Sequence, residues 1–157
     1  MGNKGGESLS FLLLGEIYLE LKNYRQTRIC AIAAMKWAKE KGIREILVKG
    51  NLLLSKLYYV KENISESLKY FKEGEKNLGN LTDPELLWEI DYQRGQIYQR
   101  QGKLNEALDC YKKCLEVFKK ICANITDKEL QESYLNAPNR KRVFTAIEEI
   151  ERKIRNV

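Results

Sequence analysis

A few residues of this 157-residue chain have side chains whose type and spacing suit chemistry. Cys110 and Cys114 lie four residues apart, which places two thiol groups on one face of a helix. A zinc site needs four ligands, and the chain has four cysteines but no histidine. Glu148 and Glu149 are adjacent, and we expect them on a solvated helix face. We therefore expect no metal, no cofactor and no enzymatic activity.

Basic side chains could instead recognise nucleic acid, and Tyr134 could stack on a base. Three short basic runs lie in the C-terminal part of the chain: Lys112-Lys113, Lys119-Lys120 and Arg140-Lys141-Arg142. Glutamates interleave with these runs, and a net charge of +6 is modest. Binding of nucleic acid through a C-terminal basic patch is therefore the alternative function.

The composition is that of a folded helical domain. Apolar residues make up 43% of the chain and charged residues 32%, which is globular rather than disordered. The early apolar run at 11–14 is far shorter than a membrane span or a signal-peptide core. The cysteines occupy packing positions, which favours a reducing compartment. We expect a cytoplasmic location.

An internal repeat divides the chain into similar segments. Tyr18, Tyr58 and Tyr98 stand forty residues apart, which predicts a solenoid of stacked units. Small residues recur at three fixed offsets from each tyrosine: Gly15, Ser55 and Gly95; Thr27, Ser67 and Ala107; Ala34, Gly74 and Cys114. We expect the first set to let paired helices approach, and the last set to admit side chains of the next pair. Phe71 and Tyr111 are expected to fill the space between pairs.

Helical periodicity divides the chain into pairs. We expect a disordered tail at 1–7, three helical pairs at about 8–42, 43–82 and 83–123, and a short helix with a final capping helix at 124–157. Asp83 and Pro84 predict a helix start, and Gly42 and Gly102 predict helix ends. The expected core face of the helix after Pro84 is Leu87, Ile90, Arg94, Ile97, Tyr98 and Gln101.

The repeated motif resembles a known family. Arg94-Gly95-Gln96-Ile97-Tyr98, followed by Gln101 to Ala107, is similar to a tetratricopeptide repeat (TPR), as are Leu14 to Tyr18 and Ser55 with Tyr58. The resemblance covers about residues 8–123, with a period of 40 in place of the common 34. It implies an all-α, right-handed α-solenoid of three TPR-like helical hairpins plus a C-terminal capping helix. Residues 129–140 are similar to segments that close TPR regions in large bacterial regulatory proteins, which implies the C-terminal part of such a protein.

The family resemblance also implies a binding surface. The first helix of each TPR hairpin lines a concave groove, so we expect a scaffold that binds a peptide or helix of a partner protein, as a regulatory module. The groove residues implied are Leu12, Glu16, Lys49, Leu53, Lys56, Tyr59, Glu89, Tyr92, Gln93, Gln96 and Arg100. Phe11, Leu12 and Leu13 form an apolar N-terminal edge, for which we expect self-association or contact with upstream repeats.

Overall fold

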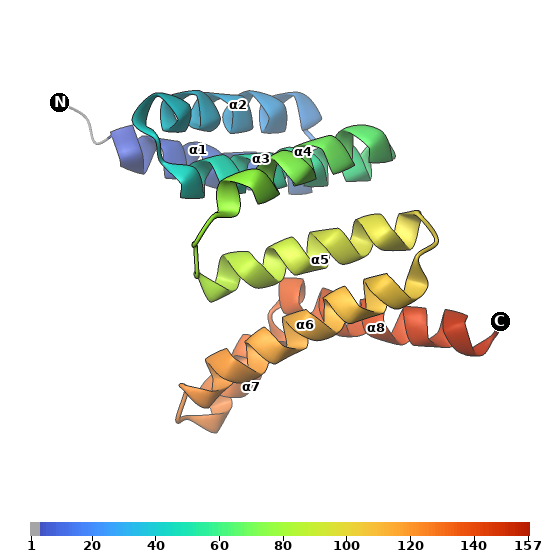
Figure 1. Cartoon of the computed structure of the whole chain (residues 1–157). Coiled ribbons are helices and arrows are strands. Elements are labelled where there is room, and N and C mark those ends of the chain that lie inside the picture. Colours follow the sequence, from blue (N-terminus) through green and yellow to red (C-terminus); the bar gives the residue numbers. More distant parts are fainter. Residues whose placement is uncertain (1–3) are drawn as a thin grey trace. The chain divides into compact units, whose positions relative to one another are not determined.

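The computed structural model describes residues 4–157 of the chain, and this part is all-α (Figure 1). Its eight helices are packed as sequential pairs, consistent with TPR-like hairpins. The helices are α1 (Lys4–Glu20), α2 (Tyr24–Lys41), α3 (Arg44–Val60), α4 (Ile64–Leu78), α5 (Pro84–Arg100), α6 (Leu104–Ala123), α7 (Lys128–Asn136) and α8 (Pro138–Arg155). The expected disordered tail at 1–7 is too long, because residues 4–7 form the first turns of α1; residues 1–3 lie outside the described part.

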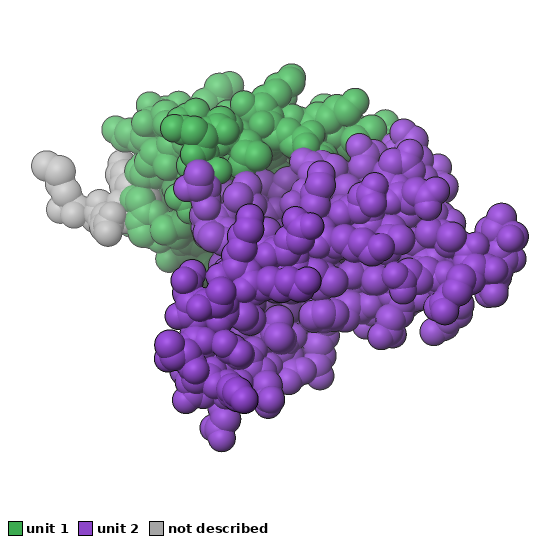
Figure 2. Space-filling model, turned by 60° about the horizontal axis from the view of Figure 1, so that its bottom comes forward, with its two compact units in different colours: residues 1–81 green, residues 82–157 purple. Residues whose placement is uncertain are grey.

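The chain divides into two compact units, coloured separately in Figure 2. Unit 1 runs to Leu81 and contains α1–α4, whereas unit 2 begins at Thr82 and contains α5–α8. Each unit has its own cluster of buried apolar side chains. The first two expected hairpins therefore share one core, and the third hairpin shares another with the C-terminal helices.

Local capping residues set the helix ends where the sequence predicts them. Pro84 is the first residue of α5, and the Asp83 side chain accepts a hydrogen bond from the Glu85 N–H. Gly42 ends α2 at φ 67°, a left-handed conformation that glycine adopts without a steric penalty. Pro138 begins α8, because a proline ring fits the first turn of a helix.

The turn inside each hairpin has one repeated backbone geometry. Lys22, Glu62 and Gly102 occupy equivalent positions, and all three have positive φ, at 58°, 60° and 76°. The next residue is the N-cap position of the second helix of the pair, and in the first two hairpins it is an asparagine. Asn23 accepts a hydrogen bond from the Gln26 N–H, and Asn63 accepts one from the Glu66 N–H. The repeat is therefore preserved in backbone conformation even where the side chains differ.

Small residues bring the helices of each pair together, as expected. A Cβ atom on Gly95 would lie 2.6 Å from Cε1 of Tyr111, so α5 and α6 pack through this glycine. In the second hairpin, the Ser67 hydroxyl donates a hydrogen bond of 2.8 Å to the Ser55 carbonyl oxygen. Close approach at one position of the repeat is thus achieved by a missing side chain in one hairpin and by a buried hydroxyl in another.

The third set of small residues packs within the hairpins, a role that was not predicted from the sequence. A Cβ atom on Gly74 would lie 3.6 Å from the Val48 carbonyl oxygen of α3, its own partner helix. At the equivalent place in unit 2, the Cys114 thiol lies 3.3 Å from the Trp88 carbonyl oxygen, to which it donates. Tyr111 likewise packs within its own hairpin. Gly74, Cys114 and Tyr111 thus each pack within their own hairpin, and Cys114 and Tyr111 also belong to the cluster that includes Val143 and Ala146 of α8.

The final helix packs on α6 through an apolar face. Val143, Ala146 and Ile150 of α8 are buried in the cluster that contains Phe118 of α6. Phe144 is partly covered, with its ring centroid 6.3 Å from that of Phe118. Most charged residues of α8 are exposed, so this helix presents a largely polar outer side.

Candidate functional site

Unit 1 brings the first helices of two hairpins together, as a shared binding surface requires. A Cβ atom on Gly15 would lie 2.6 Å from Cδ2 of Leu53 and 3.3 Å from Cβ of Cys30. Gly15 lies on α1, and both α2 and α3 approach it. The helices α1 and α3 are therefore held side by side. We use the name α1–α3 surface for the outward-facing residues along this seam: Leu9, Glu16, Glu20, Lys49, Lys56, Tyr59 and Val60.

An ion pair crosses the seam between the two helices. Lys56 Nζ lies 3.9 Å from a carboxylate oxygen of Glu16, and both side chains are partly exposed. Lys49 pairs with Glu45 on α3 at 2.6 Å. Exposed pairs of this kind contribute only about 0.2–1 kcal/mol to the free energy of unfolding, so their main effect is to fix the positions of the charged groups. The surface therefore holds charges of both signs at defined places.

Apolar side chains lie beside these charges. Val60 is 47% exposed and Leu9 is 44% exposed, at opposite ends of the α1–α3 surface. Tyr59 is partly exposed next to Val60. Aromatic residues at such positions often carry much of the energy of a protein interface. The surface therefore combines a charged centre with apolar ends.

Three of the residues assigned to the groove from the sequence are core residues instead. Leu12 and Leu53 belong to the buried cluster of unit 1, with 6% and 2% exposure. Gln93 is fully buried. Their side chains have no free face to offer a partner, and the assignment of these three to a binding surface is wrong. Leu12 is for the same reason not part of an exposed N-terminal edge, whereas Phe11 and Leu13 are exposed there.

Of the α5 residues assigned to the groove, some pack inside unit 2 and others are exposed. Tyr92 packs on α6, with its ring centroid 5.5 Å from that of Tyr111, and Gln96 donates a hydrogen bond to the Tyr92 hydroxyl. Glu89 is partly exposed and Arg100 is exposed. The expected core face of α5 thus missed the side that holds Trp88 and Tyr92. Because α5 lies in unit 2, its residues form a set separate from the α1–α3 surface.

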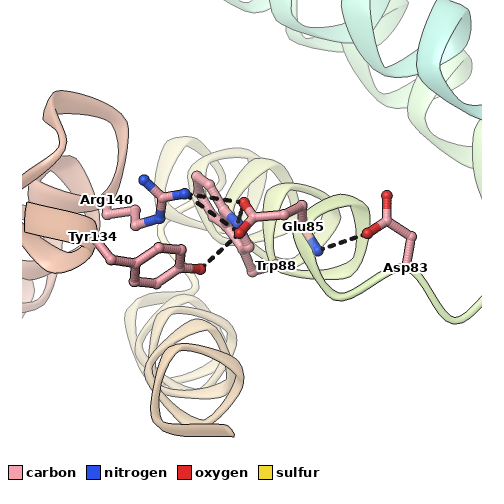
Figure 3. A network of polar contacts seen from close by, with 5 residues as sticks. All are labelled: Asp83, Glu85, Trp88, Tyr134 and Arg140. Carbon is pink, nitrogen blue, oxygen red and sulfur yellow. Dashed lines mark hydrogen bonds and ion pairs between the residues drawn. The ribbon is translucent and has the colours of Figure 1, made fainter. Parts of the chain in front are cut away.

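A polar cluster in unit 2 was not predicted from the sequence (Figure 3). The Glu85 carboxylate accepts hydrogen bonds from Trp88 Nε1 and from the Tyr134 hydroxyl, each at 2.8 Å. Arg140 donates to the same carboxylate at 3.3 Å, and its guanidinium lies 3.7 Å from the centre of the Tyr134 ring. Figure 3 shows the four side chains converging from α5, α7 and α8. The cluster ties the C-terminal helices to the third hairpin.

The electrostatics of the cluster favour a charged Glu85. Partial burial alone would raise the pKa of its carboxyl group, but hydrogen bonds from Trp88 and Tyr134 and the charge of Arg140 outweigh this and hold the pKa below its usual value. Burial, together with the hydrogen bond to Glu85, raises the pKa of Tyr134 to about 12. Tyr134 and Arg140, which the nucleic-acid alternative requires to be available, are thus engaged inside unit 2.

The cysteines are packing residues in this structure. All four are free thiols, and Cys30, Cys110 and Cys114 are buried. Burial raises the pKa of each of these three thiols, most strongly at Cys114. A thiol with a raised pKa stays protonated, and it is then a poor nucleophile and a poor metal ligand.

Comparison with known families agrees with the packing of the third hairpin. Residues 92–120 match the tetratricopeptide repeat family, and this segment covers parts of α5 and α6. The chain thus contains a tetratricopeptide repeat within an all-helical protein, and such a repeat is typical of modules that bind other proteins. No curated protein sequence matches the chain. Among the described residues, no helix combines the length and apolar content needed to cross a membrane.

Proposed function

We propose that this chain is a regulatory protein-interaction module that binds a peptide segment of a partner protein on the α1–α3 surface of unit 1. The single observation that carries the proposal is the seam at Gly15, which holds α1 and α3 together beneath the Glu16–Lys56 ion pair. Rigid helices that present fixed side chains lower the entropic cost of binding.

The chemistry of the surface describes the partner segment. An apolar side chain of the peptide would cover Val60 and lie against Tyr59, where apolar area is open to solvent. A basic residue of the peptide would approach the exposed Glu20 on the neighbouring turn of α1. The proposed ligand is therefore a segment with an apolar half and a charged half.

The chain acts in this proposal by binding rather than by catalysis. Glu148 and Glu149 are both exposed on α8, without the burial that tunes a carboxyl group for acid–base chemistry. The three buried cysteines have raised pKa values, which argues against a thiol nucleophile. These observations favour binding over catalysis as the activity of the chain.

The test begins with capture of partners from a lysate by the immobilised chain and identification of the bound segment. A synthetic peptide of that segment is then titrated against wild type and the double variant Lys56→Ala/Tyr59→Ala by calorimetry. We expect the double variant to bind at least about tenfold more weakly, a change of about 1.4 kcal/mol. The control, Lys72→Ala/Lys76→Ala on the exposed side of α4, should bind as wild type does.

Two results would contradict the proposed function. One is a peptide whose affinity is the same for wild type and for Lys56→Ala/Tyr59→Ala. The other is recovery of RNA or DNA whose affinity falls steeply as salt is raised, which indicates binding to phosphates.

A further inference from the structure

The side of α1 that faces away from the core carries an exposed apolar stripe. Leu13, Leu14 and Ile17 are 62%, 45% and 55% exposed. We use the name outer stripe for these three residues together with Ser10, which lies one turn before Leu14. The outer stripe does not include the residues of the α1–α3 surface.

The repeat places the outer stripe in register with an interface that is present in unit 1. Forty residues further on, Leu13, Leu14 and Ile17 correspond to Leu53, Leu54 and Leu57 of α3. These three leucines are only 1–2% exposed, and they lie in one cluster with Ala31, Ala34 and Ala38 of α2. The α3 positions that receive the first hairpin therefore have apolar counterparts on α1 that remain uncovered.

The fourth position of the stripe matches less closely. Ser10 corresponds to Gly50, and Gly50 is packed so closely against Met35 of α2 that an added Cβ atom would overlap with the methionine side chain. Ser10 is small but has a Cβ atom, so the flexible methionine side chain of a docked hairpin must shift at this point. The match along the stripe is therefore in the three apolar positions.

Residues just outside the stripe behave differently. Ile29 and Ile32 of α2 are also exposed, at 49% and 41%. Their counterparts in the second repeat are Lys69 and Lys72, which are exposed in unit 1. Comparison with the second repeat therefore indicates docking of a further helix on the stripe of α1, but not on these two isoleucines.

We propose that the outer stripe of α1 is an acceptor for a further helical hairpin of the same repeat type, donated by a polypeptide segment other than the hairpins of this chain. The donor would present small side chains in the pattern of Ala31, Ala34 and Ala38. A second copy of the chain cannot supply this pattern from α2, because α3 covers that side of α2 in every copy. The inference is independent of peptide binding on the α1–α3 surface.

The experiment adds such a hairpin in register to the full chain. Residues 4–43 are duplicated directly before residue 4, so that the added copy of Ala31, Ala34 and Ala38 precedes α1 as the original precedes α3. Docking should raise the thermal midpoint of unit 1 by at least about 5 °C.

Matched variants of the extended chain separate docking from a general effect. Leu14→Glu/Ile17→Glu, made in the original α1 only, should abolish this increase in the thermal midpoint. Ile29→Lys/Ile32→Lys, made in the original α2, should retain it. Circular dichroism of the same substitutions in the unextended chain checks that exposed positions tolerate the new charges.

Three outcomes would overturn the proposal. The thermal midpoint of the extended chain could be unchanged. The stabilisation could survive Leu14→Glu/Ile17→Glu. Sedimentation of the unextended chain could also reveal a stable dimer that Leu14→Glu dissociates, which would identify a second copy as the occupant. In each case, peptide affinity in Lys56→Ala/Tyr59→Ala is measured separately, so this failure is distinguishable from failure of the proposed function.

Discussion

Tyr111 occupies the space that Gly95 leaves open. Ring carbons Cε1 and Cδ1 of Tyr111 would lie 2.6 and 2.9 Å from a Cβ atom at position 95, and the tyrosine is fully buried. Its hydroxyl donates a hydrogen bond to the Gln99 side chain at 3.0 Å, one helical turn further along α5. One side chain therefore sets both the separation of α5 and α6 and their register.

Gly95→Ala should destabilise the chain. The added methyl group must displace a rigid aromatic ring in a filled core, and overpacking of this kind costs about 1–3 kcal/mol. Urea unfolding followed by circular dichroism measures the change. Gly74→Ala is the matched control, because its nearest neighbour would be Asn51 Cβ at 3.3 Å and the gain in helix propensity is up to about 1 kcal/mol. Equal effects of the two substitutions would contradict the role assigned to Gly95.

Lys22→Gly should stabilise unit 1. Lys22 has φ 58° in the turn between α1 and α2, a left-handed conformation that costs a residue with a Cβ atom about 1–2 kcal/mol. Part of this gain is offset by the greater freedom of glycine in the unfolded chain, so we expect a net increase of about 0.5–1 kcal/mol. Lys22→Ala keeps the strain and is the control. A loss of stability in Lys22→Gly would show that the lysine side chain matters more than the backbone.

Lys103→Asn should stabilise the third hairpin. Lys103 stands before α6 without a side-chain cap, where the first two hairpins have Asn23 and Asn63. An asparagine at a helix N-terminus contributes about 1 kcal/mol. The change also removes Lys103 Nζ from above the Tyr98 ring, 5.5 Å from its centroid, which is worth about 0.5 kcal/mol at an exposed site.

The expected net gain for Lys103→Asn is therefore about 0.5 kcal/mol, measured by thermal unfolding. Lys103→Ala removes the contact with Tyr98 without adding a cap, and it should be slightly destabilising. If the alanine and asparagine variants were equally stable, the side-chain cap would make no contribution at this turn.

Glu85 should make the stability of unit 2 depend on pH in the acidic range. Its pKa is lowered in the folded state, so the unfolded chain binds its proton at a higher pH. The stabilisation is present above the pKa of about 4.3 that a glutamate has in the unfolded chain. It is lost as the pH falls through the lower pKa that Glu85 has in the folded state. Denaturant unfolding at pH 7 down to pH 3 should show a steeper loss for wild type than for Glu85→Gln. The control Glu116→Gln, on the exposed side of α6, should follow wild type. Parallel curves for wild type and Glu85→Gln would contradict the assignment.

The thiols should differ in their reactivity. Cys122 is partly exposed, whereas the other three cysteines are buried and their pKa values are raised. With Ellman's reagent near neutral pH, one thiol should react rapidly and three only as fast as the chain opens. Cys122→Ser should remove the rapid phase. A rapid phase of two or more thiols would contradict the buried packing of Cys30, Cys110 and Cys114.

Helix limits could be predicted from the sequence because they depend on neighbouring residues. The Asp83–Pro84 start and the Gly42 end require only local capping chemistry. The face of α5 was predicted poorly because buried residues occur on more than one of its sides, including Trp88, Ile90 and Ile97. A helix buried in this way has no single apolar stripe from which to read its orientation.

The polar cluster could not be predicted for a different reason. Glu85 is separated from Tyr134 by 49 residues and from Arg140 by 55, so nothing in the local sequence pairs them. The groove assignment suffered from a related limit, since Leu12 and Leu53 share their helices with exposed residues of the α1–α3 surface. Alignment to a repeat locates a helix, but the fractional exposure of each side chain depends on the neighbouring helices.

The link between Leu81 and Thr82 has a consequence for protein engineering. Each half of the chain retains its own set of interlocked apolar side chains on either side of this link. A graft of a different helical array after residue 81 would therefore keep every member of the first cluster in the sequence.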